Sequence, residues 1–299
     1  MRTGTKWAAA AALCAAAYGS TARAALINEI YHNPPSTDAP NEYVEIRGTP
    51  GELLAGVYLI FLEGDSGSSN PGDVNNIFDL TSRSIGSNGF LTIRQQGSPY
   101  LVAAGTTDLV STAAGFTGGV GFSADTGTDI ENLSYTALLV HVAPGGTAPT
   151  QTLDLDAGDN GLDALPAGWT ILDGVGVLDG GASDRAYAGL VFSDDADGLI
   201  EPGATLVNLN AADWEVEYVM RFGDSTGSAA ADWFAADVTG TPPTMTVNFA
   251  QASQPGLDGL TITNHLGASN PVPEPASAGV VAAGAIGILA RRRRRARER

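Results

Sequence analysis

The feature that most constrains the fold is a series of short apolar runs, each bounded by glycine, asparagine, aspartate or proline. The run at 42–46 alternates acidic and apolar residues, as a half-buried strand does. The run at 57–62 is continuously apolar, which is typical of a central strand. The other runs are at 26–31, 76–80, 90–94, 137–142, 170–172 with 175–178, 186–192, 216–222, 245–249 and 260–263. Short strands separated by turn residues predict an all-β sandwich or barrel, with one short helical turn at 232–236.

The N-terminus has the parts of a secretory signal peptide. A short basic region precedes the apolar residues 8–18. The sequence Ala22-Arg23-Ala24 supplies the small residues of a cleavage site, so we expect cleavage between Ala24 and Ala25. Cys14, the one cysteine, lies in the segment to be removed and follows a leucine, which does not suit a lipidation site. The mature chain is therefore expected to have no disulfide and to be stabilised by its core and by bound ions.

The C-terminus has the layout of a sorting tail. A Pro-Glu-Pro sequence at 273–275 precedes an apolar run at 278–290 and a block of arginines. As a helix the run would span about 20 Å, less than the roughly 30 Å hydrocarbon core of a bilayer, which suits a transient stop more than a permanent anchor. The positive-inside rule places the arginines on the cytoplasmic side and the preceding chain outside. These arginines are Arg291, Arg292, Arg293, Arg294 and Arg295.

This tail resembles the PEP-CTERM signal of Gram-negative bacteria that make exopolysaccharide. The resemblance rests on Pro273, Glu274 and Pro275, on a hydrophobic helix expected at about 276–290, and on the arginine block. It implies an exosortase-type enzyme that recognises the Pro-Glu-Pro motif and cuts nearby, after which the chain is released or attached to another molecule. We therefore expect an exported protein of the cell surface or extracellular matrix, transiently anchored in the inner membrane through its C-terminus. The alternative, a basic tail that binds nucleic acid, does not explain the apolar run.

The segment between the two ends is strongly acidic. Five of the 15 Lys and Arg residues and 31 of the 33 Asp and Glu residues fall within 25–270, so this segment carries a net charge of about −26 and has no lysine. Such a surface repels nucleic acid and anionic membranes, and neither is expected as a partner of this segment. The charge favours divalent cations or salty surroundings. The content of Val, Ile, Leu and Phe still suffices for a packed core, so we do not expect disorder.

Two motifs near the start of this segment resemble the opening of a lamin-tail domain. Ile27-Asn28-Glu29-Ile30 and Glu42-Tyr43-Val44-Glu45-Ile46 stand where that family has an Ile-Asn-Glu-Ile strand and, after a proline-rich loop, a Glu-Tyr-Val-Glu-Leu strand. Gly56-Val57-Tyr58-Leu59 has valine where the family's next strand has tryptophan. Asp173-Gly174-Val175-Gly176-Val177 resembles a late Val-Asp-Ser-Val element, with glycine in place of serine. The resemblance implies an immunoglobulin-like β-sandwich.

The resulting domain organisation has four parts. The signal peptide at 1–24 precedes a lamin-tail-like sandwich at 25–180, which is lengthened by insertions. Residues 181–270 are interpreted as a β-rich C-terminal extension that packs on the same unit. The sorting signal occupies 271–299.

Alternation along 27–46 predicts which side chains face the core, because a one-residue slip would turn every side chain to the other face. The set expected to be buried is Ile27, Ile30, Val44 and Ile46. The set expected to face solvent on the outer side of the paired strands is Glu29, Glu42 and Glu45. The alternative is that two of these glutamates are the facing carboxylates of a glycosidase, and the solvated interpretation is preferred.

Two acidic turns are candidate calcium sites. Carboxylates at alternate positions, with a glycine for a sharp turn, can wrap oxygens around a hard cation. In the loop at 154–163 a glycine occupies one ligand position, and in the loop at 193–201 a serine occupies the first. The candidate ligands are Asp154, Asp156, Asp159 and Asp163 in the first loop and Asp195 and Asp197 in the second. The alternative is that both are acidic turns without a metal, since Asp, Asn and Gly form turns anyway.

The chain contains no convincing catalytic set, so we expect no enzymatic activity. Gly64-Asp65-Ser66 and Gly223-Asp224-Ser225 share letters with the nucleophile loop of trypsin-like proteases, but a triad needs a positioned base. The three histidines, His32, His141 and His265, are dispersed, which also argues against a zinc site. There is no phosphate-binding Gly-Lys-Ser/Thr loop.

Two functions remain open. The first is a non-enzymatic surface or matrix protein, structural or adhesive, in an exopolysaccharide or biofilm context, with exopolysaccharide or other surface proteins as partners. The alternative is a calcium-dependent extracellular hydrolase that acts on polysaccharide or nucleic acid. A cleft lined by converging carboxylates would favour the hydrolase, and a closed sandwich with scattered carboxylates would favour the first.

Overall fold

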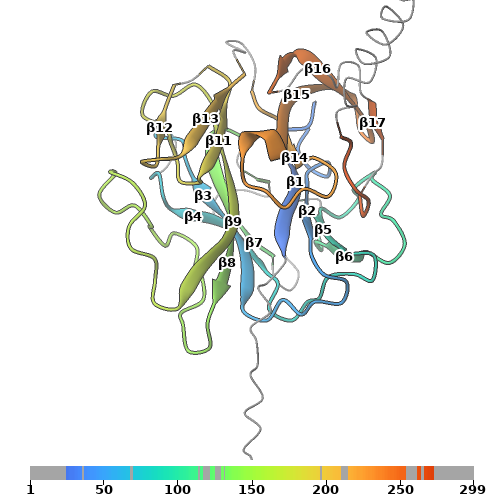
Figure 1. The fold of residues 1–299 in the computed structure, drawn as a ribbon, viewed down its shortest axis with the longest axis horizontal. Helices are drawn as coiled ribbons and strands as arrows, with labels where there is room; N and C mark the ends of the chain where they lie inside the picture. Colours follow the sequence, from blue (N-terminus) through green and yellow to red (C-terminus); the bar gives the residue numbers. More distant parts are fainter. Residues whose placement is uncertain are drawn as a thin grey trace, which may run out of the picture.

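The computed structural model describes residues 25–272 except 36, 68–69, 114, 117–121, 125–128, 131, 196, 210–214, 254–260 and 264–265. Within these residues the chain is all-β, with 17 strands and one short 3-10 helix, η1 (Ala230–Asp232). Most strands belong to two sheets that lie side by side (Figure 1). The all-β class predicted from the short apolar runs is therefore confirmed.

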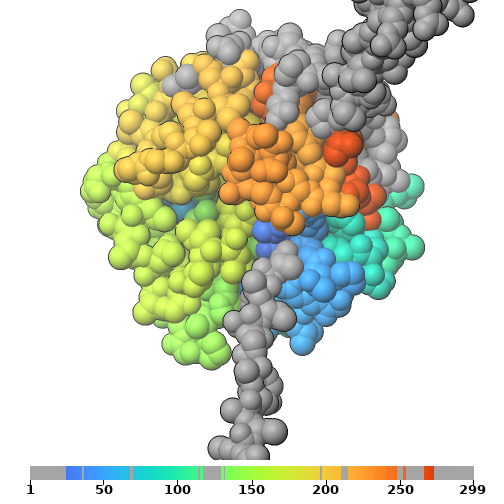
Figure 2. Space-filling model, viewed as in Figure 1, coloured from blue at the N-terminus to red at the C-terminus, as the bar shows by residue number. Residues whose placement is uncertain are grey.

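One sheet has eight strands in the order β17-β16-β15-β14-β1-β2-β5-β6. Its neighbours are antiparallel except β5 and β6, which are parallel. Its strands are β1 (Leu26–Tyr31), β2 (Tyr43–Arg47), β5 (Phe90–Arg94), β6 (Thr107–Val110), β14 (Tyr218–Arg221), β15 (Trp233–Thr241), β16 (Thr244–Ala252) and β17 (Thr261–Thr263). The first strand thus lies in the middle of the sheet, between an early strand and a late one. Figure 2 shows the late residues of this region, in orange, directly beside the early ones, in blue.

The other sheet has seven strands in the order β13-β11-β9-β8-β3-β4-β7. Its strands are β3 (Val57–Glu63), β4 (Val74–Asp79), β7 (Phe122–Ala124), β8 (Tyr135–Val142), β9 (Trp169–Leu178), β11 (Leu190–Ser193) and β13 (Thr205–Asn208). The pairs that involve β11 are parallel and the others are antiparallel. A separate parallel pair is formed by β10 (Arg185–Ala186) and β12 (Leu199–Ile200).

The main core fills the space between the two sheets. It joins side chains of β1, β2 and β5 to those of β3, β8 and β9, for example Val44 with Leu59 and Val175. The four residues predicted to be buried here, Ile27, Ile30, Val44 and Ile46, are all fully buried, so this prediction is confirmed. Ile27 and Ile30 are an odd number of residues apart, and a register shift between Ile27 and Glu29 lets both face the same core.

The prediction that the glutamates of 27–46 face solvent is wrong. Glu29, Glu42 and Glu45 are all fully buried. For Glu29 and Glu45 the physical reason is that the other face of the eight-stranded sheet is also covered. A second apolar cluster lies there, built around Tyr31, Tyr43, Tyr100 and Tyr218 with Leu266. Alternation correctly placed Glu29 and Glu45 opposite Val44 and Ile46, but that second face is interior too. Glu42 has the same parity as Val44 and accepts the N–H of Ile130, a main-core residue, so its placement on the outer face was wrong.

The seven-stranded sheet is likewise covered on both faces. Its outer side carries a third cluster that includes Ile60, Leu62 and Val140 and is capped by Leu155 and Trp169 from loops and strand ends. This explains why β3 is apolar at nearly every position, since a strand buried on both faces loses its alternation. Both sheets therefore hold polar groups in the interior, where each needs a hydrogen-bond partner.

Two local expectations need correction. The helical turn expected at 232–236 is wrong, because η1 ends at Asp232 and an extended strand, β15, begins at Trp233. The run expected as two pieces at 170–178 is one continuous strand, β9. The helix expected at about 276–290 lies outside the described residues, as does the signal peptide.

Candidate functional site

A buried ion pair joins the two sheets. Arg221, at the end of β14, donates two hydrogen bonds to the Asp173 carboxylate of β9, at 2.6 and 2.7 Å. The Arg221 side chain is 1% exposed. Its Nε donates to the carbonyl of Ile27 at 2.7 Å, and the Ile27 N–H donates to Asp173 at 2.8 Å. The guanidinium carbon lies 4.2 Å from the ring centroid of Trp233, which adds a cation–π contact. This network fixes β1, β9 and β14 together.

Arg47, at the end of β2, lies beside the same region but is less completely paired. Its side chain is 10% exposed, and its Nη1 donates to the carbonyl of Gly223 at 3.0 Å. The nearest carboxylate, that of Asp224, is 3.7 Å away on an 89% exposed side chain. The Nη2 atom is buried and has no hydrogen-bond partner within the described part of the chain. Burial lowers the pKa of Arg47, and the neighbouring Arg221 adds to this effect.

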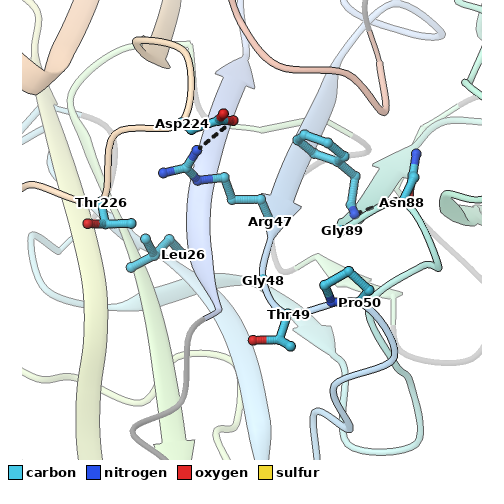
Figure 3. A pocket seen from close by; sticks show the side chains of 10 residues that line it. Leu26, Arg47, Gly48, Thr49, Pro50, Asn88, Gly89, Asp224 and Thr226 are labelled. Carbon is cyan, nitrogen blue, oxygen red and sulfur yellow. Dashed lines mark hydrogen bonds and ion pairs between the residues drawn. The ribbon is translucent and has the colours of Figure 1, made fainter.

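A cavity of about 360 Å³ opens beside Arg47 (Figure 3). Its wall combines polar and apolar side chains from the β1, β2 and β5 ends and from the loop after β14. These side chains include Leu26, Thr49, Pro50, Phe90 and Thr226. One signal for this place was present in the sequence, since only five arginines occur in a segment of about −26, but neither Arg47 nor Arg221 belongs to a recognisable motif.

Two further cavities, of about 260 and 340 Å³, lie on the other sheet and its loops. The first is lined by Asp173, whose carboxylate is engaged by Arg221. The second is lined by Asp159 together with Arg185. Each of the three cavities thus contains one carboxylate residue, whereas glycoside hydrolysis usually requires two carboxylates about 5–10 Å apart. None of the three therefore has the converging carboxylates that would favour the hydrolase.

The first predicted calcium loop is organised around Asp156, which is fully buried. Its Oδ1 accepts hydrogen bonds from the backbone N–H groups of Asn160 and Gly161, at 2.8 and 3.0 Å. Its Oδ2 accepts one from the Tyr187 hydroxyl at 3.0 Å and lies 3.8 Å from Arg185. The other acids of this loop are arranged differently. Asp154 accepts the Asp156 N–H, Asp163 accepts the Ala157 N–H, and Asp159 adopts a positive φ of 48°.

In the second predicted loop the carboxylates also accept hydrogen bonds from backbone N–H groups of the same loop. Asp195 accepts the backbone N–H of Asp197 at 2.9 Å, and Asp194 accepts that of Asp195 at 2.8 Å. Among the described residues, no group of three or more His, Cys, Asp and Glu side chains is arranged to hold a metal ion. The carboxylates as they stand serve as turn acceptors, and calcium at either loop stays a prediction.

The calcium prediction can be separated from simple screening of the acidic surface. Calcium that binds only the folded chain stabilises it by about 2.7 kcal/mol at a hundredfold excess over Kd, which raises the melting temperature of a domain this size by about 5–10 °C. Melting curves of the exported protein in EDTA, in millimolar calcium and in sodium chloride of matched ionic strength test this. Equal shifts in calcium and in matched salt, or a calcium shift that survives Asp156→Ala and Asp197→Ala, would leave both loops as acidic turns.

The protease-like Gly-Asp-Ser sequences also form turns. The Ser66 hydroxyl donates to Asp184 at 3.0 Å, and the Ser225 hydroxyl donates to Asp232 at 2.5 Å. His32 is fully buried, and its Nδ1 lies 3.0 Å from the Tyr135 hydroxyl. Burial lowers the pKa of His32 to about 3, so it is neutral in the fold. His141 is half-buried on β8, and His265 lies outside the described residues.

Three buried glutamates, in β1, in β2 and just before β2, act as hydrogen-bond acceptors. Glu42 accepts the Ile130 N–H at 3.0 Å and the Gln95 amide at 2.7 Å. Glu45 accepts the Asn28 amide at 2.6 Å, and Glu29 accepts the Tyr218 hydroxyl at 2.9 Å. Burial raises the pKa of Glu42 and of Glu45 well above the usual range. Glu29 and Glu45 thus bind Tyr218 and Gly267 on the second face of the sheet, whereas Glu42 binds Ile130 of the main core.

Burial also raises the pKa of other acidic side chains. Burial raises the pKa of Glu217 to about 9, with help from its hydrogen bond to the Asp237 side chain. Burial also raises the pKa of Asp179 to about 7, and the charges of Glu215 and Asp194 add to this. The fold therefore retains protons that the unfolded chain would release near neutral pH.

The chain immediately before the Pro-Glu-Pro motif is fixed to the body. We call residues 266–272 the strap. Its Gly267 N–H donates to Glu45, and its Gly267 carbonyl accepts the Asn88 amide at 2.9 Å. The Leu266 carbonyl accepts the Ala103 N–H at 2.8 Å.

The strap also reaches the neighbourhood of Arg47. Ser269 donates to Asp224 at 2.5 Å, and the Asn270 amide donates to the Asn28 carbonyl at 3.3 Å. A Cβ at Gly223 would lie 2.6 Å from Val272. The buried part of the strap thus continues to Asn270, and Val272, which is 56% exposed, is the last described residue before Pro273.

The sorting residues themselves, Pro273, Glu274, Pro275 and the arginine block, lie outside the described residues, and so does Ala24. Ala25, the first described residue, is buried against the main core. No helix among the described residues is long and apolar enough to cross a bilayer.

The comparisons with known proteins address the C-terminus. A search of curated proteins gave no match to the chain. A family model described as the PEP-CTERM protein-sorting motif matches residues 271–295, which begin within the strap and include both the Pro-Glu-Pro sequence and the arginine block. Such a motif implies recognition by an exosortase-type processing enzyme and export to the surface or the extracellular space. The chain is thereby identified as a PEP-CTERM protein, by the motif at its C-terminal end.

Proposed function

We propose that this chain is a non-enzymatic protein of the cell surface or extracellular matrix, structural or adhesive in an exopolysaccharide or biofilm context. The observation that carries the proposal is the direct connection of a sorting motif to a closed all-β body through the packed strap. The acids of the body are consistent with this role. They accept hydrogen bonds within turns and between layers, as Asp156 and Glu45 do.

The body is proposed to be a lamin-tail-like, immunoglobulin-like sandwich with insertions. Two observations support this. The motifs at 27–30 and 42–46 form the paired strands β1 and β2, and two sheets enclose one core. The segment after 181 contributes strands to both sheets, with β11 next to β9 and β14 next to β1.

The route to the surface is proposed as follows. The signal peptide is removed before Ala25, and the apolar segment at about 276–290 holds the chain transiently in the inner membrane, with Arg291–Arg295 on the cytoplasmic side. An exosortase-type enzyme then cuts near Pro273–Pro275. Because the strap is held to the body through Asn270, the enzyme would meet the motif close to the surface of a folded body.

The sorting motif gives a direct test. We expect the exported protein from its host to have an intact mass that begins near Ala25 and lacks Arg291–Arg299, and to fractionate with the matrix or surface. Replacement of Pro273, Glu274 and Pro275 by alanine is expected to leave the tail attached and the protein in the inner membrane. Glu298→Ala, outside the matched residues 271–295, is the control and should be processed normally. Normal processing of the triple variant, or wild-type protein absent from matrix and surface fractions, would contradict the proposal.

A further inference from the structure

Arg47 differs from Arg94 and Arg221 because its guanidinium is buried without a close carboxylate. Arg94 and Arg221 each make paired hydrogen bonds to one aspartate at 2.6–2.8 Å. Arg47 has one backbone acceptor at 3.0 Å, an exposed carboxylate at 3.7 Å, and a buried Nη2 with no partner in the described part of the chain. A buried cation that lacks a close carboxylate is costly, and a planar guanidinium fits a carboxylate.

The cavity beside Arg47 offers more than a charge. Its volume of about 360 Å³ lies at the lower end of the range for small-ligand sites. Thr49 and Thr226 are hydroxyl-bearing residues of its lining, and Phe90 and Pro50 supply apolar surface. A sugar ring matches this wall, since it presents hydroxyl groups at its edge and C–H groups on its face. In Figure 3 the Arg47 guanidinium lies beside the Asp224 carboxylate, and Leu26 lies on its other side.

We propose that the cavity at Arg47 is a binding site for a carboxylated sugar, with the Arg47 guanidinium on the sugar carboxylate and Phe90 and Pro50 against the ring. The net charge of about −26 over 25–270 limits this to a sugar acid that is isolated or sparse in its polymer, because a dense polyanion would be repelled. This inference rests on the proposed function and names the ligand class of the surface protein.

Asp224 provides the sharpest test, because it is the carboxylate that a sugar acid must displace or share. Its side chain is 89% exposed and is also held by Ser269. Asp224→Asn removes the competing charge and keeps a side chain of the same size. We therefore expect this variant to bind the sugar acid several-fold more tightly, while Arg47→Gln should bind it at least tenfold more weakly.

The experiment is calorimetric titration of the exported protein with methyl glucuronoside, methyl glucoside and acetate. Glucuronoside is expected to bind at least tenfold more tightly than either of the others. Arg94→Gln, which breaks a surface pair with Asp108 away from the cavity, is the matched control and should leave the affinity unchanged. Melting curves of each variant check the fold, and if Arg47→Gln does not fold, Asp224→Asn decides.

The outcomes separate the site from the proposed function. Equal affinity for glucuronoside and glucoside would remove Arg47 from recognition, and equal affinity for glucuronoside and acetate would reduce the site to a carboxylate contact without a sugar. Either result, or no tightening in Asp224→Asn, overturns the inference. Protein that still fractionates with the matrix in these cases leaves the proposed function standing, whereas protein absent from the matrix overturns that function whatever it binds.

Discussion

Asp173→Ala is expected to lower the free energy of unfolding by about 3–5 kcal/mol, because it leaves the Arg221 guanidinium buried without its counter-ion. Arg221 is 1% exposed and cannot reach water without opening the contact between β1, β9 and β14. The same substitution also removes the acceptor of the Ile27 N–H. Burial raises the pKa of Asp173 even beside Arg221, which indicates that removing this carboxylate from water is costly.

Urea unfolding of wild type and variant measures this effect, with Asp108→Ala as the matched control. The Arg94–Asp108 pair has a similar distance of 2.7 Å, but its side chains are 19% and 29% exposed. Exposed pairs contribute about 0–1 kcal/mol, so the control should lose much less. If both variants lose the same free energy of unfolding, burial does not set the strength of the Asp173–Arg221 pair. The network would then not be what joins the two sheets.

A double variant tests whether the loss of stability in Asp173→Ala comes from the unpaired charge of Arg221. Asp173→Leu with Arg221→Met removes both charges, and we expect it to be more stable than Asp173→Ala, since no buried charge is left unpaired. It should still fall below wild type, because the carbonyl of Ile27 loses its donor from Arg221. With the single variants Asp173→Leu and Arg221→Met, the double variant completes a double-mutant cycle. The coupling energy from that cycle measures the interaction between the two charged side chains.

The sequence predicted the strand content and the inward face of 27–46, because both depend on local alternation. Ile27, Ile30, Val44 and Ile46 lie in the main core as expected. Alternation says that Glu29 and Glu45 face the opposite way, but it does not say what lies there. That face is covered by Tyr100 and Leu266, which are distant in sequence, so the exposure of the glutamates was not predictable from their own strands.

The pairing of strands that are far apart in the sequence could not be predicted either, because the pattern of one strand does not identify its neighbour. β1 pairs with β14, and the Arg221–Ile27 hydrogen bond joins residues 194 positions apart. A strand's pattern specifies its faces but not its neighbour. A charged residue within an apolar run, as Asp173 is, was the available signal for a buried ion pair. The partner still had to be found in space.

The sorting motif behaves differently, since its recognition depends on a short contiguous sequence. The Pro-Glu-Pro motif, the apolar run and the arginines follow one another within 271–295, and no tertiary contact is needed to recognise them. The Arg47 cavity, in contrast, is not formed by one contiguous sequence. It brings together Leu26, Phe90 and Thr226 from three distant parts of the chain. A site of that kind becomes visible only when the sheets are assembled.

Glu217→Gln is expected to stabilise the protein at neutral and alkaline pH and to flatten its pH dependence. Burial and the hydrogen bond with Asp237 raise the pKa of Glu217 to about 9, against an ordinary value of about 4.5. The folded chain therefore keeps a proton that the unfolded chain releases, so the contribution of Glu217 to stability is highest below pH 4.5 and falls as the pH rises toward 9. Glutamine has no proton to lose, and its amide oxygen can still accept the Val238 N–H, now 2.7 Å from Glu217.

Urea unfolding at pH 5.5 and at pH 7.5 measures this slope. A single group in its titration window changes stability by at most about 1.4 kcal/mol per pH unit, so wild type should lose roughly 1–3 kcal/mol more than Glu217→Gln over this interval. Asp179, whose pKa is raised to about 7, contributes equally to both proteins and cancels in the difference. Asp237→Asn is the matched variant, because it removes the partner carboxylate and should recover part of the same effect. Combined with Glu217→Gln it should add little, since the two acids act as one unit. Parallel pH profiles for wild type and Glu217→Gln would show that Glu217 is ionised in the folded protein, and that the proton is not held between β14 and β15.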